Sequence, residues 1–122
     1  MALLALALRP DEPTLLGELS VAEAALGQNE EALRHARHAV EILPPSVDAV
    51  AGPMCEMRLA QVLAMTGDRD GAFDQLSKLV KLPFSMVNYG DLKLNPIWDD
   101  LRGDPRFDRI LAESASALAA GG

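Results

Sequence analysis

Apolar positions recur every three or four residues along most of the chain, which is the spacing of amphipathic helices. Two stretches share one sequence pattern. An apolar segment ends at a glycine, a short polar turn follows, and a second helical segment opens with an alanine five residues after the glycine. The glycines are Gly27 and Gly67, the alanines are Ala32 and Ala72, and the two copies lie forty residues apart. The pattern predicts two helical hairpins in series.

The first hairpin is expected over residues 11–45. Its first helix covers 11–26 with Asp11 as the N-cap, and Gly27 closes it in the left-handed conformation. Asn29 is expected to cap the second helix, which runs to about Leu43. The buried stripe of the first helix is expected at apolar residues with helical spacing, which are Leu15, Leu16, Leu19, Ala22 and Leu26.

The second hairpin is expected over residues 46–84. Its first helix runs from a Ser46 cap to Thr66, and we expect Gly52-Pro53 to kink or divide it. Asp68 is expected to cap the second helix, which ends at Pro83.

Both ends of the chain depart from the hairpin pattern. Residues 1–9 are apolar nearly all round and stop at Pro10, so residues 1–10 are interpreted as the second half of a partial repeat. We therefore expect the chain to begin inside a longer repeat array. Residues 85–122 are interpreted as a C-terminal helical cap, with helices near 86–93, 96–102 and 105–119.

The net charge of the chain argues against some classes of binding partner. The formal net charge is −7 and the sequence pI is near 4.7, which argues against nucleic acid as a partner because its binding needs Lys and Arg at phosphates. A basic membrane-binding face and a membrane-spanning apolar run are also lacking. A single cysteine, Cys55, is compatible with a reducing compartment, and we expect a cytoplasmic protein.

With its flanks, the repeated segment resembles the tetratricopeptide repeat family. The family's motif is a helix pair of 34 residues with a large–small pair, a turn glycine, spaced alanines and a terminal proline. The matching residues of the first copy are Leu19-Ser20, Gly27, Ala32, Ala36, Ala39 and Pro44. The departures are Glu23 and Leu63, where the family has an aromatic residue, and the longer spacing between copies. The resemblance implies an all-α, right-handed superhelical array of antiparallel helix pairs in one domain.

The tail carries a second resemblance. The segment from Leu94 to Phe107 resembles the one that closes repeat arrays in bacterial multidomain signalling proteins. This resemblance implies that the chain is the regulatory end of such a protein or a stand-alone relative, acting by protein–protein interaction or scaffolding. Trp98 and Phe107 are expected to cover the open end of the last hairpin.

Candidate chemistry is sparse. Glu31, His35 and His38 share one helical face, so a metal-assisted hydrolase using His35 and His38 is an alternative. We expect instead a solvated face with an ordinary Glu31–His35 pair. No phosphate-binding loop or nucleophile motif is present, so we expect no enzyme activity, no cofactor and no resident metal.

The expected binding surface is the concave groove that the family resemblance places on the first helix of each hairpin. There it implies partner-binding residues Val21, Met54, Met57 and Gln61, and the methionines suit an apolar or amphipathic helix or peptide. In one alternative the chain's own segment Phe84–Leu94 occupies the groove. In another, the module forms a homodimer through its apolar N-terminal helix.

Overall fold

The computed structural model describes residues 12–44, 46–48, 51–81 and 87–121, with side chains up to residue 116. Every regular element in these ranges is helical, which confirms the all-α class for them. The elements are α2 (Pro13–Ala25), α3 (Asn29–Ile42), α4 (Ala51–Met65), α5 (Arg69–Leu79), α6 (Tyr89–Leu94), the 3₁₀ helix η1 (Pro96–Leu101) and α7 (Pro105–Gly121). The helix expected over residues 1–9 lies outside the described residues.

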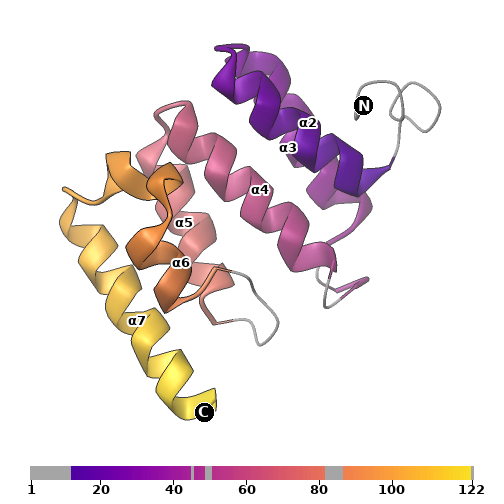
Figure 1. Ribbon diagram of the computed structural model, residues 1–122. Coiled ribbons are helices and arrows are strands. Elements are labelled where there is room, and N and C mark those ends of the chain that lie inside the picture. The colour runs from indigo at the N-terminus through magenta and orange to yellow at the C-terminus, as the bar shows by residue number, and fades with distance from the viewer. Residues whose placement is uncertain (1–11, 45, 49–50, 82–86, 122) are drawn as a thin grey trace.

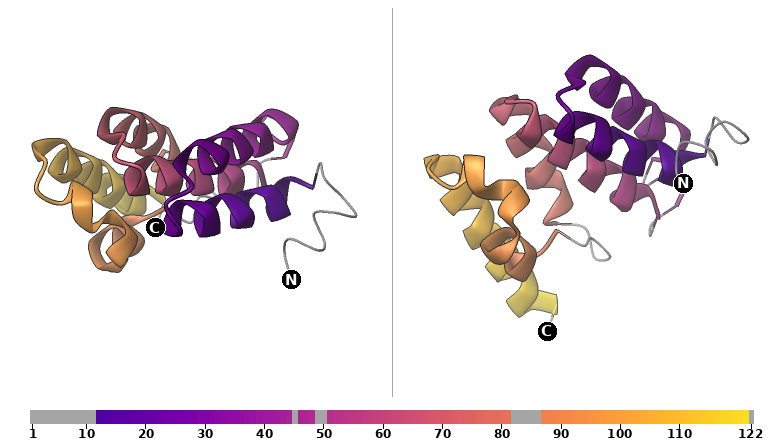
Figure 2. Two further views of the ribbon diagram at one scale, coloured as in Figure 1. Left: turned by 90° about the horizontal axis from the view of Figure 1, so that it is seen from above. Right: turned by 45° about the horizontal axis from the view of Figure 1, so that its top comes forward.

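The helices form successive pairs that lie side by side (Figure 1). α2 packs on α3 and α4 packs on α5, while α4 also contacts both helices of the first pair. On its other side α4 contacts η1, and α7 packs against α5 and α6. The pairs follow one another from the N-terminal to the C-terminal part of the described chain (Figure 2). Ten of the 15 residues of α4 are buried, so this helix is the centre of the core.

The two hairpin turns have the same geometry. Gly27 and Gly67 have φ angles of 82° and 90°, a conformation that L-residues with a side chain rarely adopt. In each turn the residue after the glycine donates its backbone N–H to the carbonyl four residues before the glycine, Glu23 or Leu63, at 2.9 Å. These hydrogen bonds satisfy carbonyls at the end of the first helix in the manner of a Schellman motif. The predicted role of both glycines is confirmed.

Several helix boundaries differ from the sequence-based expectation. Asp11 lies outside the described residues, and the side chain that caps α2 is Glu12, which accepts a hydrogen bond from the Thr14 N–H at 3.1 Å. Asn29 is itself the first residue of α3, and no side chain caps that helix. Asp68 does cap α5, because its carboxylate accepts the Gly71 N–H at 2.9 Å.

The prediction that Gly52-Pro53 kinks or divides a helix beginning at Ser46 is wrong. α4 begins at Ala51 rather than near Ser46, and Asp48 accepts the Ala51 N–H at 2.8 Å. Gly52 and Pro53 therefore occupy the first turn of α4. A proline there removes no intrahelical hydrogen bond, because the first N–H groups of a helix have no partner within it.

The predicted buried stripe of α2 is partly wrong. Leu16 is buried, but Ala22 is exposed and Leu26 is 75% exposed. The other buried residues of α2 are Gly17, Ser20, Glu23 and Ala24. The reason is that α2 contacts both α3 and α4, so two adjoining faces of α2 are buried. The turn residue Leu26 lies outside these contacts and faces outward.

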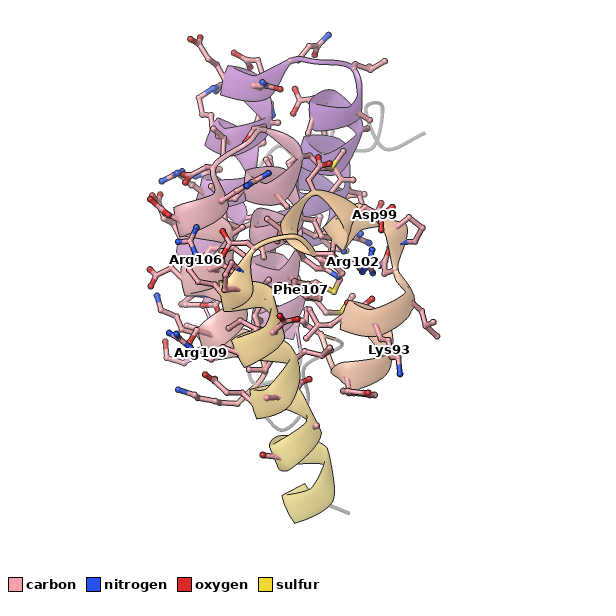
Figure 3. The ribbon with its side chains drawn as sticks, turned by 90° about the vertical axis from the view of Figure 1, so that its left-hand side faces the viewer. Lys93, Asp99, Arg102, Arg106, Phe107 and Arg109 are labelled. Atoms are coloured by element: carbon pink, nitrogen blue, oxygen red, sulfur yellow. The ribbon has the colours of Figure 1, made fainter. Side chains whose placement is uncertain are left out.

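The C-terminal segment packs onto the second hairpin as predicted. Trp98 and Phe107 are 0% and 3% exposed and share one core cluster with side chains of α4 and α5. Figure 3 shows Phe107 at the start of α7, close to Arg102. The Arg102 guanidinium donates to the carbonyls of Leu92 and Asn95 at 2.9 Å, which ties η1 to the end of α6. The short helix expected near 96–102 is present as a 3₁₀ helix over Pro96–Leu101.

Candidate functional site

The four predicted groove residues lie on the neighbouring helices α2 and α4, but their exposure differs. Val21 and Met54 are half-buried, whereas Met57 and Gln61 are only 6% and 4% exposed. A partner would therefore find surface beside the first turns of α4 and almost none farther along it. The partner-binding role of these residues stays a prediction.

The tail also packs on α4. Met57 belongs to the same core cluster as Trp98 of η1, and η1 contacts α4 directly. In one alternative the segment Phe84–Leu94 covers the groove, and its residues 84–86 lie outside the described part of the chain. Val87 and Leu92 of this segment join the core cluster to which α4 contributes, and η1 contacts α4 as well.

The open part of the α2–α4 face contains a small hollow. It has a volume of about 20 Å³ and is lined by Pro13, Thr14, Gly17, Glu18, Met54, Cys55 and Arg58. Gly17 permits the close approach of the two helices, because a Cβ there would lie 3.1 Å from the Cγ of Arg58. The Arg58 guanidinium donates to Oε1 of Gln61 at 3.2 Å, so buried Gln61 orients a residue that lines the hollow.

Cys55, at the side of this hollow, is a poor nucleophile. Burial raises the pKa of its thiol, and the nearby carboxylates of Glu12, Asp48 and Glu56 raise that pKa further. The thiol is therefore protonated at neutral pH, and a thiolate is the reactive form. This geometry supports a packing role for Cys55.

A polar cluster lies between the two helices of the first hairpin, around His35 of α3. The His35 Nδ1 lies 2.6 Å from Oε1 of Glu23, and their side chains are 19% and 11% exposed. The predicted Glu31–His35 pair is wrong, since Glu31 forms an ion pair with Arg34 and His35 turns toward α2. His38 points elsewhere, with its Nδ1 3.9 Å from a carboxylate oxygen of Glu41.

The proposed pairing of His35 with His38 in a metal-assisted hydrolase is not supported by these positions. Among the described residues, the donor atoms that come together belong to Glu23, Glu31 and His35, and they lie within 4.8 Å of one another. Glu23 was not predicted to take part. One feature of the sequence could have indicated that Glu23 is buried. It lies four residues before Gly27, and the residue at the same position before Gly67 is Leu63, which is buried.

The charged side chains at the tail serve to hold helices together. Hydrogen bonds from Arg106 keep the pKa of Asp104 below its usual value, and the same guanidinium lies 4.5 Å from the centroid of the Phe73 ring. Asp99 forms an ion pair with Arg102. Figure 3 shows Arg102 and Arg106 near Phe107. Arg106 of α7 connects to α5 through the ring of Phe73 and through an ion pair with Asp70.

Comparison with family models, with curated proteins and with solved structures gives no match. Among the described residues no helix is both long and apolar enough to cross a lipid bilayer. The functional conclusion therefore rests on the geometry of this chain and on the resemblance that its sequence carries.

Proposed function

We propose that this protein is a non-catalytic binding module of the tetratricopeptide-repeat type. Its partner is a protein segment that places one apolar side chain in the hollow between α2 and α4. The observation that carries the proposal is that hollow, which lies between the first helices of two similar hairpins and is lined by both. The resemblance of residues 94–107 supports the regulatory end of a bacterial signalling protein as its setting.

The size of the hollow selects the class of partner. Pockets for drug-sized ligands and cofactors measure roughly 300–1,000 Å³, whereas this one measures about 20 Å³. It holds about one water-sized probe, enough for the tip of one side chain. A peptide or helix supplies such a side chain together with neighbouring contacts on the rest of the face.

The lining of the hollow fits an amphipathic segment. Met54 offers a flexible thioether that adapts to different apolar side chains. Glu18 and Arg58 place opposite charges in the same lining, where they can pair with polar groups that flank the apolar anchor. The net charge of −7 favours a basic segment, because complementary charge accelerates association and makes it sensitive to salt.

The proposal is tested by selecting helical peptides from a displayed library against the folded chain. Selected peptides are then measured for affinity against Met54→Asp and Thr14→Asp, which place a carboxylate at the hollow without altering a fully buried residue. The matched control is Leu94→Asp, because Leu94 is 78% exposed on α6 and far from the hollow in sequence.

We expect each hollow variant to lower the affinity about tenfold or more, equivalent to about 1.4 kcal/mol, and the control to leave it within about twofold. Equal losses in all three variants would show that binding is unspecific. Selection that yields no peptide sensitive to Met54→Asp would overturn the proposal.

A further inference from the structure

The first hairpin brings three metal-ligating side chains together from two helices. Glu31 and His35 are separated by one helical turn on α3, which places them on the same face. Glu23 reaches them from α2, and one donor atom from each of the three lies within 4.8 Å of the others. The set consists of two carboxylates and one imidazole.

The second hairpin provides an internal comparison. It has the same glycine turn and the same backbone hydrogen bonds around it. The three cluster residues of the first hairpin lie four residues before, four after and eight after Gly27. The residues at the same offsets from Gly67 are Leu63, Gly71 and Gln75. Since none of these three is a strong metal ligand, the hairpin architecture forms without such side chains.

Burial of Glu23 is therefore unnecessary for the fold and carries an energetic cost. Glu23 is only 8% exposed, and the equivalent Leu63 is 3% exposed and packs in the core. A buried carboxylate loses hydration, and an apolar residue of similar volume at such a site is commonly as stabilising or more so. The carboxylate of Glu23 contacts the imidazole of His35 at 2.6 Å, so the buried part of the cluster is a carboxylate–imidazole pair.

We propose that Glu23, Glu31 and His35 form a binding site for one divalent first-row transition-metal ion of the Zn²⁺ class. Carboxylate and imidazole donors suit such ions. An ion about 2.0–2.2 Å from each donor holds the donors roughly 3.3–3.5 Å apart in tetrahedral geometry. The His35–Glu23 distance of 2.6 Å must lengthen slightly, and Glu31 must leave its exposed ion pair with Arg34.

The cost of releasing Glu31 from Arg34 is small, and this side of the site is accessible to solvent. Ion pairs between exposed side chains contribute about 0–1 kcal/mol, and the side chains of Glu31 and Arg34 are 52% and 65% exposed. His35 also borders an open hollow of about 400 Å³ along α3. Solvent reaches the cluster through the side chain of Glu31, which is 52% exposed, and water completes the coordination of the ion there.

The test is a titration of the untagged full chain with Zn²⁺ in competition with a chromophoric chelator. We expect one Zn²⁺ per chain, and visible absorption bands of low-symmetry coordination when Co²⁺ replaces it. Glu23→Leu copies the second hairpin, and Glu31→Gln changes an exposed side chain. Each variant is expected to retain the far-UV circular dichroism of the wild type and to bind Zn²⁺ more than about tenfold more weakly.

The matched control is His38→Gln, which removes the other histidine of α3 and is expected to leave the affinity unchanged. Excess Mg²⁺ is expected not to displace Zn²⁺, because Mg²⁺ prefers an all-oxygen octahedral site. Three results would each overturn the proposal: no Zn²⁺ uptake by the wild type, equal loss in His38→Gln, or full affinity in Glu31→Gln. None depends on whether a peptide binds at the α2–α4 hollow.

Discussion

Replacement of Trp98 by alanine tests whether the C-terminal segment is part of the same core as the hairpins. The Trp98 side chain is fully buried and shares a cluster with Met57 of α4 and Leu76 of α5. Its indole N–H donates to Oδ2 of Asp91 at 2.9 Å. The substitution therefore removes a large apolar surface and a hydrogen bond to a carboxylate.

Truncation of a buried tryptophan to alanine costs about 3–5 kcal/mol. Asp91 keeps a hydrogen bond from the side-chain amide of Asn95 at 2.9 Å, so its carboxylate retains a partner after the change. We therefore expect a loss of about 4 kcal/mol, a large part of the 5–15 kcal/mol by which natural domains are stable. With a urea m-value of about 2 kcal/mol/M, the unfolding midpoint falls by about 2 M.

The assay is urea unfolding followed by circular dichroism at 222 nm, with Trp98→Phe as the matched control. The phenylalanine retains an aromatic ring and loses the hydrogen bond to Asp91, so we expect a smaller loss of about 1–3 kcal/mol. Both variants should unfold in one transition. A Trp98→Ala protein whose main transition stays at the wild-type midpoint would refute the packing of the tail into the core.

Three further predictions concern the turn, the thiol and acid stability. Gly27→Ala is expected to lower the free energy of unfolding by about 1–2 kcal/mol because φ is 82° there, while Gly103→Ala, with open space around it, should be nearly neutral in the same melts. Cys55 should react with a disulfide reagent far more slowly in the folded protein than in denaturant, because burial raises its pKa; equal rates would contradict this. Arg106 lowers the pKa of Asp104, so the stability that Asp104 contributes is present above its unfolded pKa and lost as pH falls through its folded pKa. The difference in stability between wild type and Asp104→Asn should therefore narrow below about pH 4; a difference that stays constant on acidification would contradict this.

Sequence reasoning succeeded where the determinants of structure are local. The glycine turns at Gly27 and Gly67 require a left-handed conformation, and the Asp68 and Asn95 side chains accept N–H groups two or three residues away. Such signals act within one turn of the chain, so a single sequence contains all the information. The order of helices in the described residues follows from them.

The extent of burial could not be predicted in the same way. A helical period identifies which face is apolar but not which later segment packs on it. η1 packs on α4, and Met57, which was expected at the groove, lies in the core cluster that also contains Trp98. The apolar turn residue Leu26 is 75% exposed for the converse reason, since no described helix packs over it. Whether an apolar side chain is buried or exposed therefore depends on tertiary contacts between segments far apart in sequence.

The polar cluster of the first hairpin shows the same limitation. Glu31 and His35 stand one turn apart, so their sequence spacing suggested a pair. The pairing that forms joins His35 to Glu23 across twelve residues, because the hairpin places α2 alongside α3. The buried position of Glu23 became evident only when the two helices were placed together.

Chemical-shift mapping of a ¹⁵N-labelled chain with a selected peptide tests the proposed binding face most directly. If the α2–α4 hollow is the site, the largest amide shifts will fall on Thr14, Gly17 and Met54, which line it, and the amides of α7 will stay unchanged. Saturable shifts concentrated on α7 or on the outer face of α3, with the residues of the hollow unaffected, would contradict the proposed function.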